Sequence, residues 1–229
     1  MTSTTGSFIL LGGPEARTDG LARQALELAA GTRVAVVPLA AAFGAPEHEV
    51  VAAATWLHGA GAEVEGIMAM NRSEADTPEL AARVADADLA LLVDGSAMHL
   101  RTALKATALL GQLASLLARG GVLVAEGSSA TVLCDPMVDP RGGAPTVGLG
   151  LLAGLTVVSH IAGESPETAK DKLERTAALV PQGLPVLGLA NDAAVLVDAD
   201  RRLRTIGAGV VSVLRGGAAV DPEGLRLDG

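Results

Sequence analysis

Aromatic residues are almost absent from this chain of 229 residues, which has two phenylalanines, one tryptophan and no tyrosine. Nothing in it offers the row of aromatic side chains on which bases or sugars stack. Basic residues are also few, with 17 Lys and Arg against 26 Asp and Glu, so the formal net charge is −9. Because this acidic balance opposes binding to a phosphate backbone, we expect no nucleic-acid partner.

Cysteine is nearly missing too, since Cys134 is the only one. A single cysteine excludes an intramolecular disulfide and a multi-cysteine zinc site, and it indicates a reducing, cytoplasmic compartment. Residues 1–7 are polar, without a basic region followed by an apolar core, so they predict no signal peptide. There is no uninterrupted apolar run of about 18 residues, and we predict no membrane span.

Hydrophobic residues make up 49% of the chain, enough for a substantial core in a single domain covering residues 1–229. Short apolar runs alternate with helical patterns, and the runs lie at 8–11, 33–39, 63–67, 87–93 and 122–125. This order predicts an α/β three-layer sandwich, with a mostly parallel central sheet and helices on both faces. The apolar segments 186–189, 193–197 and 208–214 predict a C-terminal hairpin on the sheet.

The stretch 120–135 contains the strongest catalytic signal. A buried strand at 122–125 is followed by Gly127-Ser128-Ser129-Ala130 and then by residues that can open a helix. A hydroxyl at a sharp turn from strand to helix can be exposed beside backbone N–H donors, which is what a serine nucleophile needs. Ser129 is therefore the candidate nucleophile, although small residues also occur at ordinary tight turns.

Glycines and prolines crowd the segment 136–154, which predicts a loop beside the site rather than a long regular element. The apolar run 155–158 then leads to His160 at the end of a strand. This position suits a general base, but it equally suits a structural histidine.

Several motifs together resemble the cyanophycinase and aspartyl dipeptidase (dipeptidase E) family of serine peptidases. The similarity covers nearly the whole chain. Its more specific pieces are Leu92-Val93-Asp94-Gly95-Ser96, Gly127-Ser128-Ser129-Ala130, Val157-Val158-Ser159-His160 and Pro185-Val186-Leu187-Gly188-Leu189. The resemblance implies a fold similar to class I glutamine amidotransferases.

The resemblance also implies a function. Ser129 would attack the amide, His160 would act as base and then acid, and the N–H groups of Gly95 and Ala130 would form the oxyanion hole. The substrates would be small, aspartyl peptides. The resemblance implies neither a metal nor a cofactor. It also implies that the chain forms a homodimer.

Three residues depart from the family pattern: Asp94 in place of one of a glycine pair, Thr131 in place of the second elbow glycine, and Asn191 at the expected acid. The third catalytic residue is left open between Asn191, Asp192, Asp135 and Asp139, with Asp192 the first choice. The departures favour a second hypothesis, in which the chain is a catalytically inactive family member that acts as a binding or interaction protein.

Overall fold

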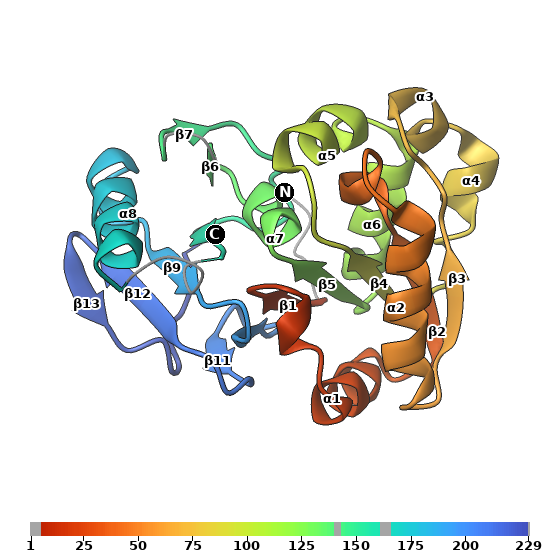
Figure 1. Cartoon of the computed structure of the whole chain (residues 1–229), viewed down its shortest axis with the longest axis horizontal. Helices are drawn as coiled ribbons and strands as arrows, with labels where there is room; N and C mark the ends of the chain where they lie inside the picture. Colours follow the sequence, from red (N-terminus) through yellow and green to blue (C-terminus); the bar gives the residue numbers. More distant parts are fainter. Residues whose placement is uncertain (1–5, 140–142, 161–165, 229) are drawn as a thin grey trace.

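The computed structural model describes residues 6–139, 143–160 and 166–228. Two sheets lie next to one another, a large one with helices around it and a smaller one that carries the last helix (Figure 1). No helix of these described ranges combines the length and the hydropathy needed to cross a membrane.

The large sheet has the strand order β11-β10-β1-β5-β4-β2-β3. The five strands from β1 to the edge strand β3 are parallel, whereas β10 and β11 are antiparallel to their neighbours. The strands are β1 (Ser7–Leu11), β2 (Arg33–Val37), β3 (Glu63–Gly66), β4 (Leu89–Leu92), β5 (Val122–Glu126), β10 (Ala194–Val197) and β11 (Leu203–Thr205).

Helices cover both faces of the large sheet, which explains why its inner strands are mostly apolar on both faces. In β1, Phe8 and Leu10 contact one core, while Ile9 and Leu11 contact the other. The first core is closed by α3 (Arg72–Ala75), α4 (Pro78–Ala82), α5 (Ala97–Leu104), α6 (Ala108–Ala118) and α7 (Ser128–Leu133). The second is closed by α1 (Asp19–Ala29) and α2 (Pro46–His58). The predicted three-layer α/β sandwich is confirmed.

Two short 3₁₀ helices, η1 (Pro14–Ala16) and η2 (Leu39–Ala41), follow β1 and β2. Polar caps begin three of the helices: Thr18, Ser96 and Thr107 each accept a backbone N–H three residues ahead, at α1, α5 and α6.

The small sheet has the order β13-β12-β9-β8. Its strands are β8 (Thr156–Val158), β9 (Val186–Leu189), β12 (Val211–Arg215) and β13 (Ala218–Val220). One face packs against α8 (Pro166–Leu179) through Leu173 and Val180. Val157, Leu187 and Val213 belong instead to the core of the large sheet, so the two sheets share one apolar interior.

The predicted C-terminal hairpin lies on the large sheet as β10 and β11. The other two segments of the last third differ from the prediction, since they pair with each other in the small sheet as β9 and β12. In the described part of the predicted loop, residues 136–139 and 143–154, the strands are a short pair of two residues each, β6 (Met137–Val138) and β7 (Pro145–Thr146).

Candidate functional site

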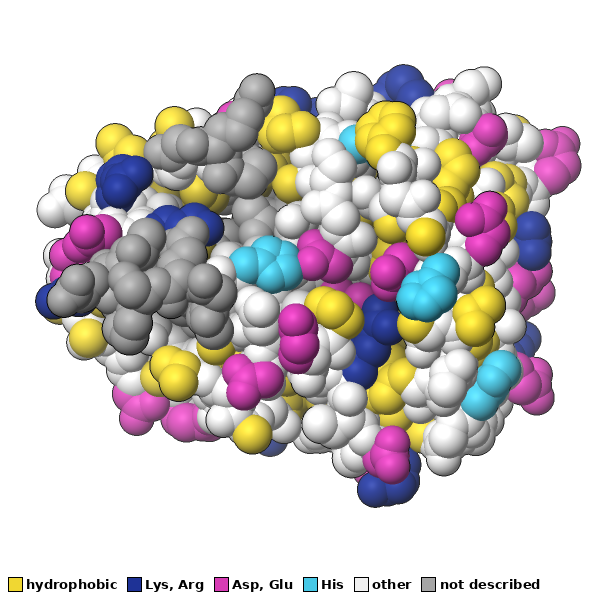
Figure 2. Space-filling model, viewed as in Figure 1, with side chains coloured by type: hydrophobic (Ala, Val, Ile, Leu, Met, Phe, Trp, Pro, Cys, Tyr) yellow, Lys and Arg dark blue, Asp and Glu magenta, His cyan; other side chains and the backbone are white. Residues whose placement is uncertain are grey.

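The carboxyl ends of β1, β5 and β4 meet at one edge of the large sheet, because Leu11 is in register with Glu126 and Leu92 with Ala125. Ligands of open α/β sheets bind at this edge. In Figure 2, acidic, basic and histidine side chains gather across the middle of the molecule. The residues that follow these strands therefore define the candidate site.

Gly127 forms the sharp turn between β5 and α7, because β5 ends at Glu126 and α7 begins at Ser128. Its backbone angles, φ 51° and ψ −120°, are strained for any residue with a side chain. At a strand-to-helix elbow the nucleophile occupies this strained position, where its side chain is exposed at the top of the sheet. The elbow position is thus held by a glycine, two residues before Ser129.

Ser129 lies inside α7 rather than at the turn. Its side chain is buried, with a relative exposure of 0%, and its Oγ donates a hydrogen bond of 2.6 Å to the carbonyl oxygen of Val93. The hydroxyl therefore stabilises the contact between α7 and the end of β4. The neighbouring Ser128 is half-buried and lines a cavity together with His160.

Asp94 fills the space above the elbow. A Cβ atom built on Gly127 would lie 2.3 Å from the Cγ of Asp94. Asp94 Oδ1 accepts hydrogen bonds from the N–H groups of Gly95 at 2.7 Å and Ser128 at 2.8 Å. These two converging donors form the kind of pocket that binds an oxyanion, and a carboxylate of the chain itself occupies it.

The two N–H groups expected to form the oxyanion hole are therefore placed differently. Gly95 does direct its N–H into the pocket, but the N–H of Ala130 donates to Gly127 O at 3.1 Å within the first turn of α7. The helix begins earlier than the sequence indicates, and Ser128 takes the position beside Gly95.

His160 contacts the other oxygen of the same carboxylate. Its Nε2 lies 2.9 Å from Asp94 Oδ2, and since a carboxylate only accepts, the imidazole donates. The hydrogen bond to Asp94 raises the pKa of His160 above its ordinary value, although burial opposes the rise. Burial would raise the pKa of Asp94, but hydrogen bonds from His160, Ser128 and Gly95 keep it below its ordinary value. When His160 is protonated, Asp94 and His160 form an ion pair.

His160 has an unusual backbone, with φ 58° in the left-handed region. Asn191 is its second polar neighbour and favours the imidazolium. Asn191 Oδ1 is buried, and among the described residues it makes no hydrogen bond of good geometry. Asp192 is an exposed turn residue whose carboxylate lies over Gly209. Of Asn191 and Asp192, Asn191 is the residue whose side chain is directed at the imidazole of His160.

The other two acid candidates lie in the segment after α7. Asp135 is exposed and Asp139 is half-buried. The identity of a third catalytic residue stays a prediction.

A second ion pair lies directly below the elbow. No motif in the sequence predicted it. Arg17 donates to both carboxylate oxygens of Glu126, at 2.6 and 2.7 Å, and the Glu126 side chain is completely buried. Burial raises the pKa of Glu126, and the hydrogen bond from Arg17 limits the rise. Arg17 is also 3.8 Å from Glu49 and stacks over Trp56, with 6.0 Å to the ring centroid.

The cavity beside His160 is small, about 70 Å³. Its polar lining residues are Ser128, Thr131, Ser159, His160 and Lys172. Thr131, which replaces an elbow glycine of the family, is buried, with its hydroxyl 3.4 Å from that of Ser159. A molecule of a few heavy atoms fits here, next to the Asp94–His160 pair.

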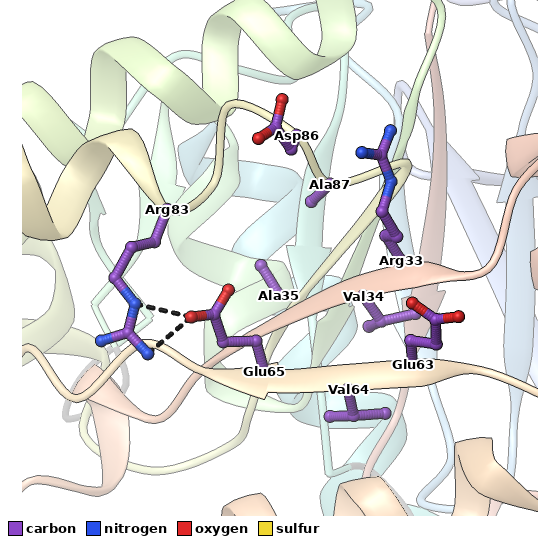
Figure 3. A pocket seen from close by; sticks show the side chains of 9 residues that line it. All are labelled: Arg33, Val34, Ala35, Glu63, Val64, Glu65, Arg83, Asp86 and Ala87. Atoms are coloured by element: carbon purple, nitrogen blue, oxygen red, sulfur yellow. Dashed lines mark hydrogen bonds and ion pairs between the residues drawn. The ribbon is translucent and has the colours of Figure 1, made fainter.

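A larger cavity of about 370 Å³ lies between β2, β3 and the segment after α4 (Figure 3). Arg83 and Glu65 form an ion pair across it, and Arg33 and Asp86 also line it. It opens beside the beginnings of β2 and β3, away from the carboxyl edge that holds the elbow.

Cys134 is buried, and burial raises the pKa of its thiol to about 12, so the thiol is unreactive at neutral pH. Within residues 6–139, 143–160 and 166–228, no group of three or more His, Cys, Asp and Glu side chains could hold a metal ion.

Comparisons with known proteins agree with the fold. A crystal structure of a peptidase from an acI-B1 actinobacterium is similar, with a TM-score of 0.79, 20% identity, and coverage of 96% of this chain and 98% of that one. A putative peptidase E protein from Listeria monocytogenes EGD-e gives a TM-score of 0.61, 16% identity, and coverage of 92% and 98%. At these identities the two structures establish the fold alone.

A search of curated proteins finds no match. The family model for peptidase family S51 matches residues 8–205, a segment that includes every element of the large sheet except the first residue of β1. The cyanophycinase and dipeptidase E resemblance is thereby confirmed, and the chain belongs to peptidase family S51.

Proposed function

We infer that this member of peptidase family S51 does not cleave amides through Ser129, and that it uses the cleft around Asp94 and His160 to bind a small ligand. One observation carries the inference. The elbow residue is Gly127, and the carboxylate of Asp94 occupies both the space of a nucleophile side chain and the converging N–H donors. A substrate carbonyl has no free oxyanion hole in this arrangement.

Ser129 supports the same inference. A nucleophile must reach the substrate and share a proton with its base, but the Ser129 hydroxyl is buried and directed at Val93 O. His160, the expected base, is bound to Asp94 instead.

The test is an assay with small aspartyl peptides, the substrate class expected from the family. We expect no hydrolysis above background from the native chain or from Ser129→Ala. The double variant Gly127→Ser with Asp94→Gly should gain activity, because it places a hydroxyl at the elbow and frees the N–H donors. Each single variant serves as the control, since each restores only one of these two features.

Hydrolysis by the native chain that falls by about 100-fold or more in Ser129→Ala would overturn the inference, since removing a catalytic nucleophile costs at least this much.

A serine peptidase that uses Ser128 is the second candidate function. Ser128 is half-buried and lines the same cavity as His160. If the native chain cleaves aspartyl peptides and Ser128→Ala abolishes the cleavage while Ser129→Ala does not, this second function replaces the first.

The homodimer and the cytoplasmic location expected from the sequence stay predictions. Light scattering of the purified chain measures the first, and fractionation of cells that express it measures the second.

A further inference from the structure

The two oxygens of Asp94 have different surroundings. Oδ1 is held by the N–H groups of Gly95 and Ser128, while Oδ2 contacts His160. The side chains of Asp94 and His160 keep relative exposures of 24% and 37%, so both are accessible from the cleft. Asp94 therefore stands where a nucleophile stands in a strand-to-helix elbow site, with the His160 imidazole on Oδ2, the oxygen that does not accept from Gly95 and Ser128.

We propose that Asp94 is a carboxylate nucleophile that opens small, neutral epoxides, with His160 as proton donor and then as base. The proposal rests on the proposed function, because it requires that no serine acts at the elbow. It goes beyond that function by naming the ligand class and a reaction.

The occupied N–H donors determine the type of electrophile. Attack on an amide, ester or phosphate places a new negative charge on a substrate oxygen, which needs donors that Asp94 already uses. Displacement at a tetrahedral carbon creates no such charge at the attacked atom. An epoxide needs only a proton for the departing oxygen, and the imidazolium of His160 adjoins the reacting carboxylate.

In the first step, Asp94 Oδ2 forms a bond to an epoxide carbon and the C–O bond of the ring breaks. The electron pair of that bond stays on the ring oxygen, which takes the proton of His160. The products are a hydroxyalkyl ester of Asp94 and a neutral imidazole. Protonation of His160 before the step is favoured, since Asp94 raises its pKa.

In the second step, the neutral imidazole removes a proton from water and the hydroxide attacks Cγ of the ester. The negative charge develops on Oδ1, which the N–H groups of Gly95 and Ser128 already hold. Collapse of the tetrahedral intermediate breaks the bond to the alkyl oxygen, which receives the proton from His160. A diol leaves, and the remaining carboxyl proton returns to His160, so one epoxide and one water give one diol.

The neighbouring cavity sets the size of the substrate. Its volume of about 70 Å³ suits an epoxide of a few heavy atoms, and Lys172 places a positive charge in its lining. That charge favours the negative oxygen that develops as the ring opens.

The experiment incubates the native chain with propylene oxide in water enriched in ¹⁸O, followed by mass spectrometry of the peptides. We expect ¹⁸O in the Asp94 carboxylate after several turnovers, because the oxygen of the attacking water stays on Cγ in place of Oδ2, which leaves in the diol. His160→Gln should form the ester of Asp94 more slowly, since it lacks the proton donor of the first step, and should not hydrolyse the ester that does form. Asp94→Asn should lose both the label and diol formation.

Asp88 is a matched control. Its side chain has a relative exposure of 25%, it accepts the N–H of Arg33 and it pairs with the Arg33 guanidinium, but it lies outside the elbow site. Asp88 should stay unlabelled, and Asp88→Asn should leave labelling of Asp94 unchanged.

Absence of both label and ester at Asp94 would overturn the proposal and leave the Asp94–His160 pair as a structural ion pair. Equal modification of Asp88 and Asp94 would overturn it as well. The proposed function fails by a different result, Ser129-dependent cleavage of aspartyl peptides, so the two failures are distinguishable.

Discussion

Two ion pairs flank Gly127, and they differ in almost every physical respect. Arg17 and Glu126 form a bidentate pair with side-chain exposures of 9% and 0%. Asp94 and His160 form a single hydrogen bond, with exposures of 24% and 37%. The first pair lies beneath the elbow and is almost completely shielded from solvent. The second pair lies above the elbow and is partly exposed.

The difference separates a structural pair from the pair that we propose to be functional. A buried charge is tolerated only while its partner is present, so removing either Arg17 or Glu126 should strongly destabilise the fold. The pair therefore fixes the geometry of the strand end. A partly exposed ion pair contributes little to stability. Because their side chains are partly exposed, Asp94 and His160 can contact water and ligands. The following predictions test this separation, from the largest expected effect to the smallest.

Glu126→Gln should lower the free energy of unfolding by about 3–5 kcal/mol, because it leaves the buried Arg17 charge unpaired. Urea denaturation measures the change. The double variant Arg17→Met with Glu126→Leu should lose less than this single variant, since neither charge remains.

The exposed Arg33–Asp88 pair provides the control, and Asp88→Asn should change the stability by at most about 1 kcal/mol. Equal losses at Glu126 and Asp88 would contradict the distinction between buried and exposed pairs.

Gly127→Ala should destabilise the fold by about 1–3 kcal/mol, because its Cβ overlaps the Asp94 carboxylate and its backbone is strained. Part of this loss should vanish in an Asp94→Gly background, with a coupling above about 0.5 kcal/mol in a thermal or urea double-mutant cycle.

Gly120→Ala is the control for backbone strain alone, since Gly120 has φ 91° and nothing within 4 Å of a built Cβ. If Gly127 shows no coupling to Asp94, the carboxylate does not occupy the elbow position.

Ser129→Ala should lower the free energy of unfolding by about 1–2 kcal/mol, because it removes a buried hydrogen bond and leaves Val93 O without it. Ser128→Ala, at a half-buried position, should stay within about 0.5 kcal/mol of the native chain. Denaturation curves recorded side by side distinguish the two. The reverse order would mean that Ser128 is the structural hydroxyl and Ser129 the free one.

Asp94→Asn should lower the pKa of His160, which NMR titration of the imidazole protons measures. The raised pKa of His160 contributes stability below about pH 6.5, its unfolded value, and the contribution is lost as pH rises through the folded pKa. The lowered pKa of Asp94 contributes above about pH 3.9, and that contribution is lost as pH falls through its folded pKa. Both contributions are therefore present between these pH values.

Their sum should stay below about 1 kcal/mol because both side chains are partly exposed. Asp88→Asn should leave the titration of His160 unchanged. An unaltered titration in Asp94→Asn would show that the pair is not formed in solution.

Much of the fold follows from local patterns. The runs at 8–11, 33–39, 87–93 and 122–125 predict buried parallel strands, and β1, β2, β4 and β5 occupy them. The small sheet was not predicted, because the pairing of β9 with β12 joins segments that lie on either side of the β10–β11 hairpin.

The site was predictable only in part. The glycine-rich segment after β5 and the position of His160 at a strand end identified the right edge of the sheet. The sequence also marked Asp94 as a departure from the family. It misplaced the elbow by two residues, since Gly127-Ser128-Ser129-Ala130 allows α7 to begin at more than one residue.

Composition and periodicity by themselves determined the buried strands and the residues that follow them, because burial on both faces imposes a continuous apolar run. The family was indicated instead by a resemblance in four short motifs. Only the tertiary structure decided that Ser129 is buried and that Asp94 occupies the converging N–H donors at the elbow. These outcomes depend on where α7 begins, on the φ and ψ of Gly127, and on the approach of β4 to β5. They depend on contacts between residues that lie far apart in the sequence, and no short stretch of sequence encodes them.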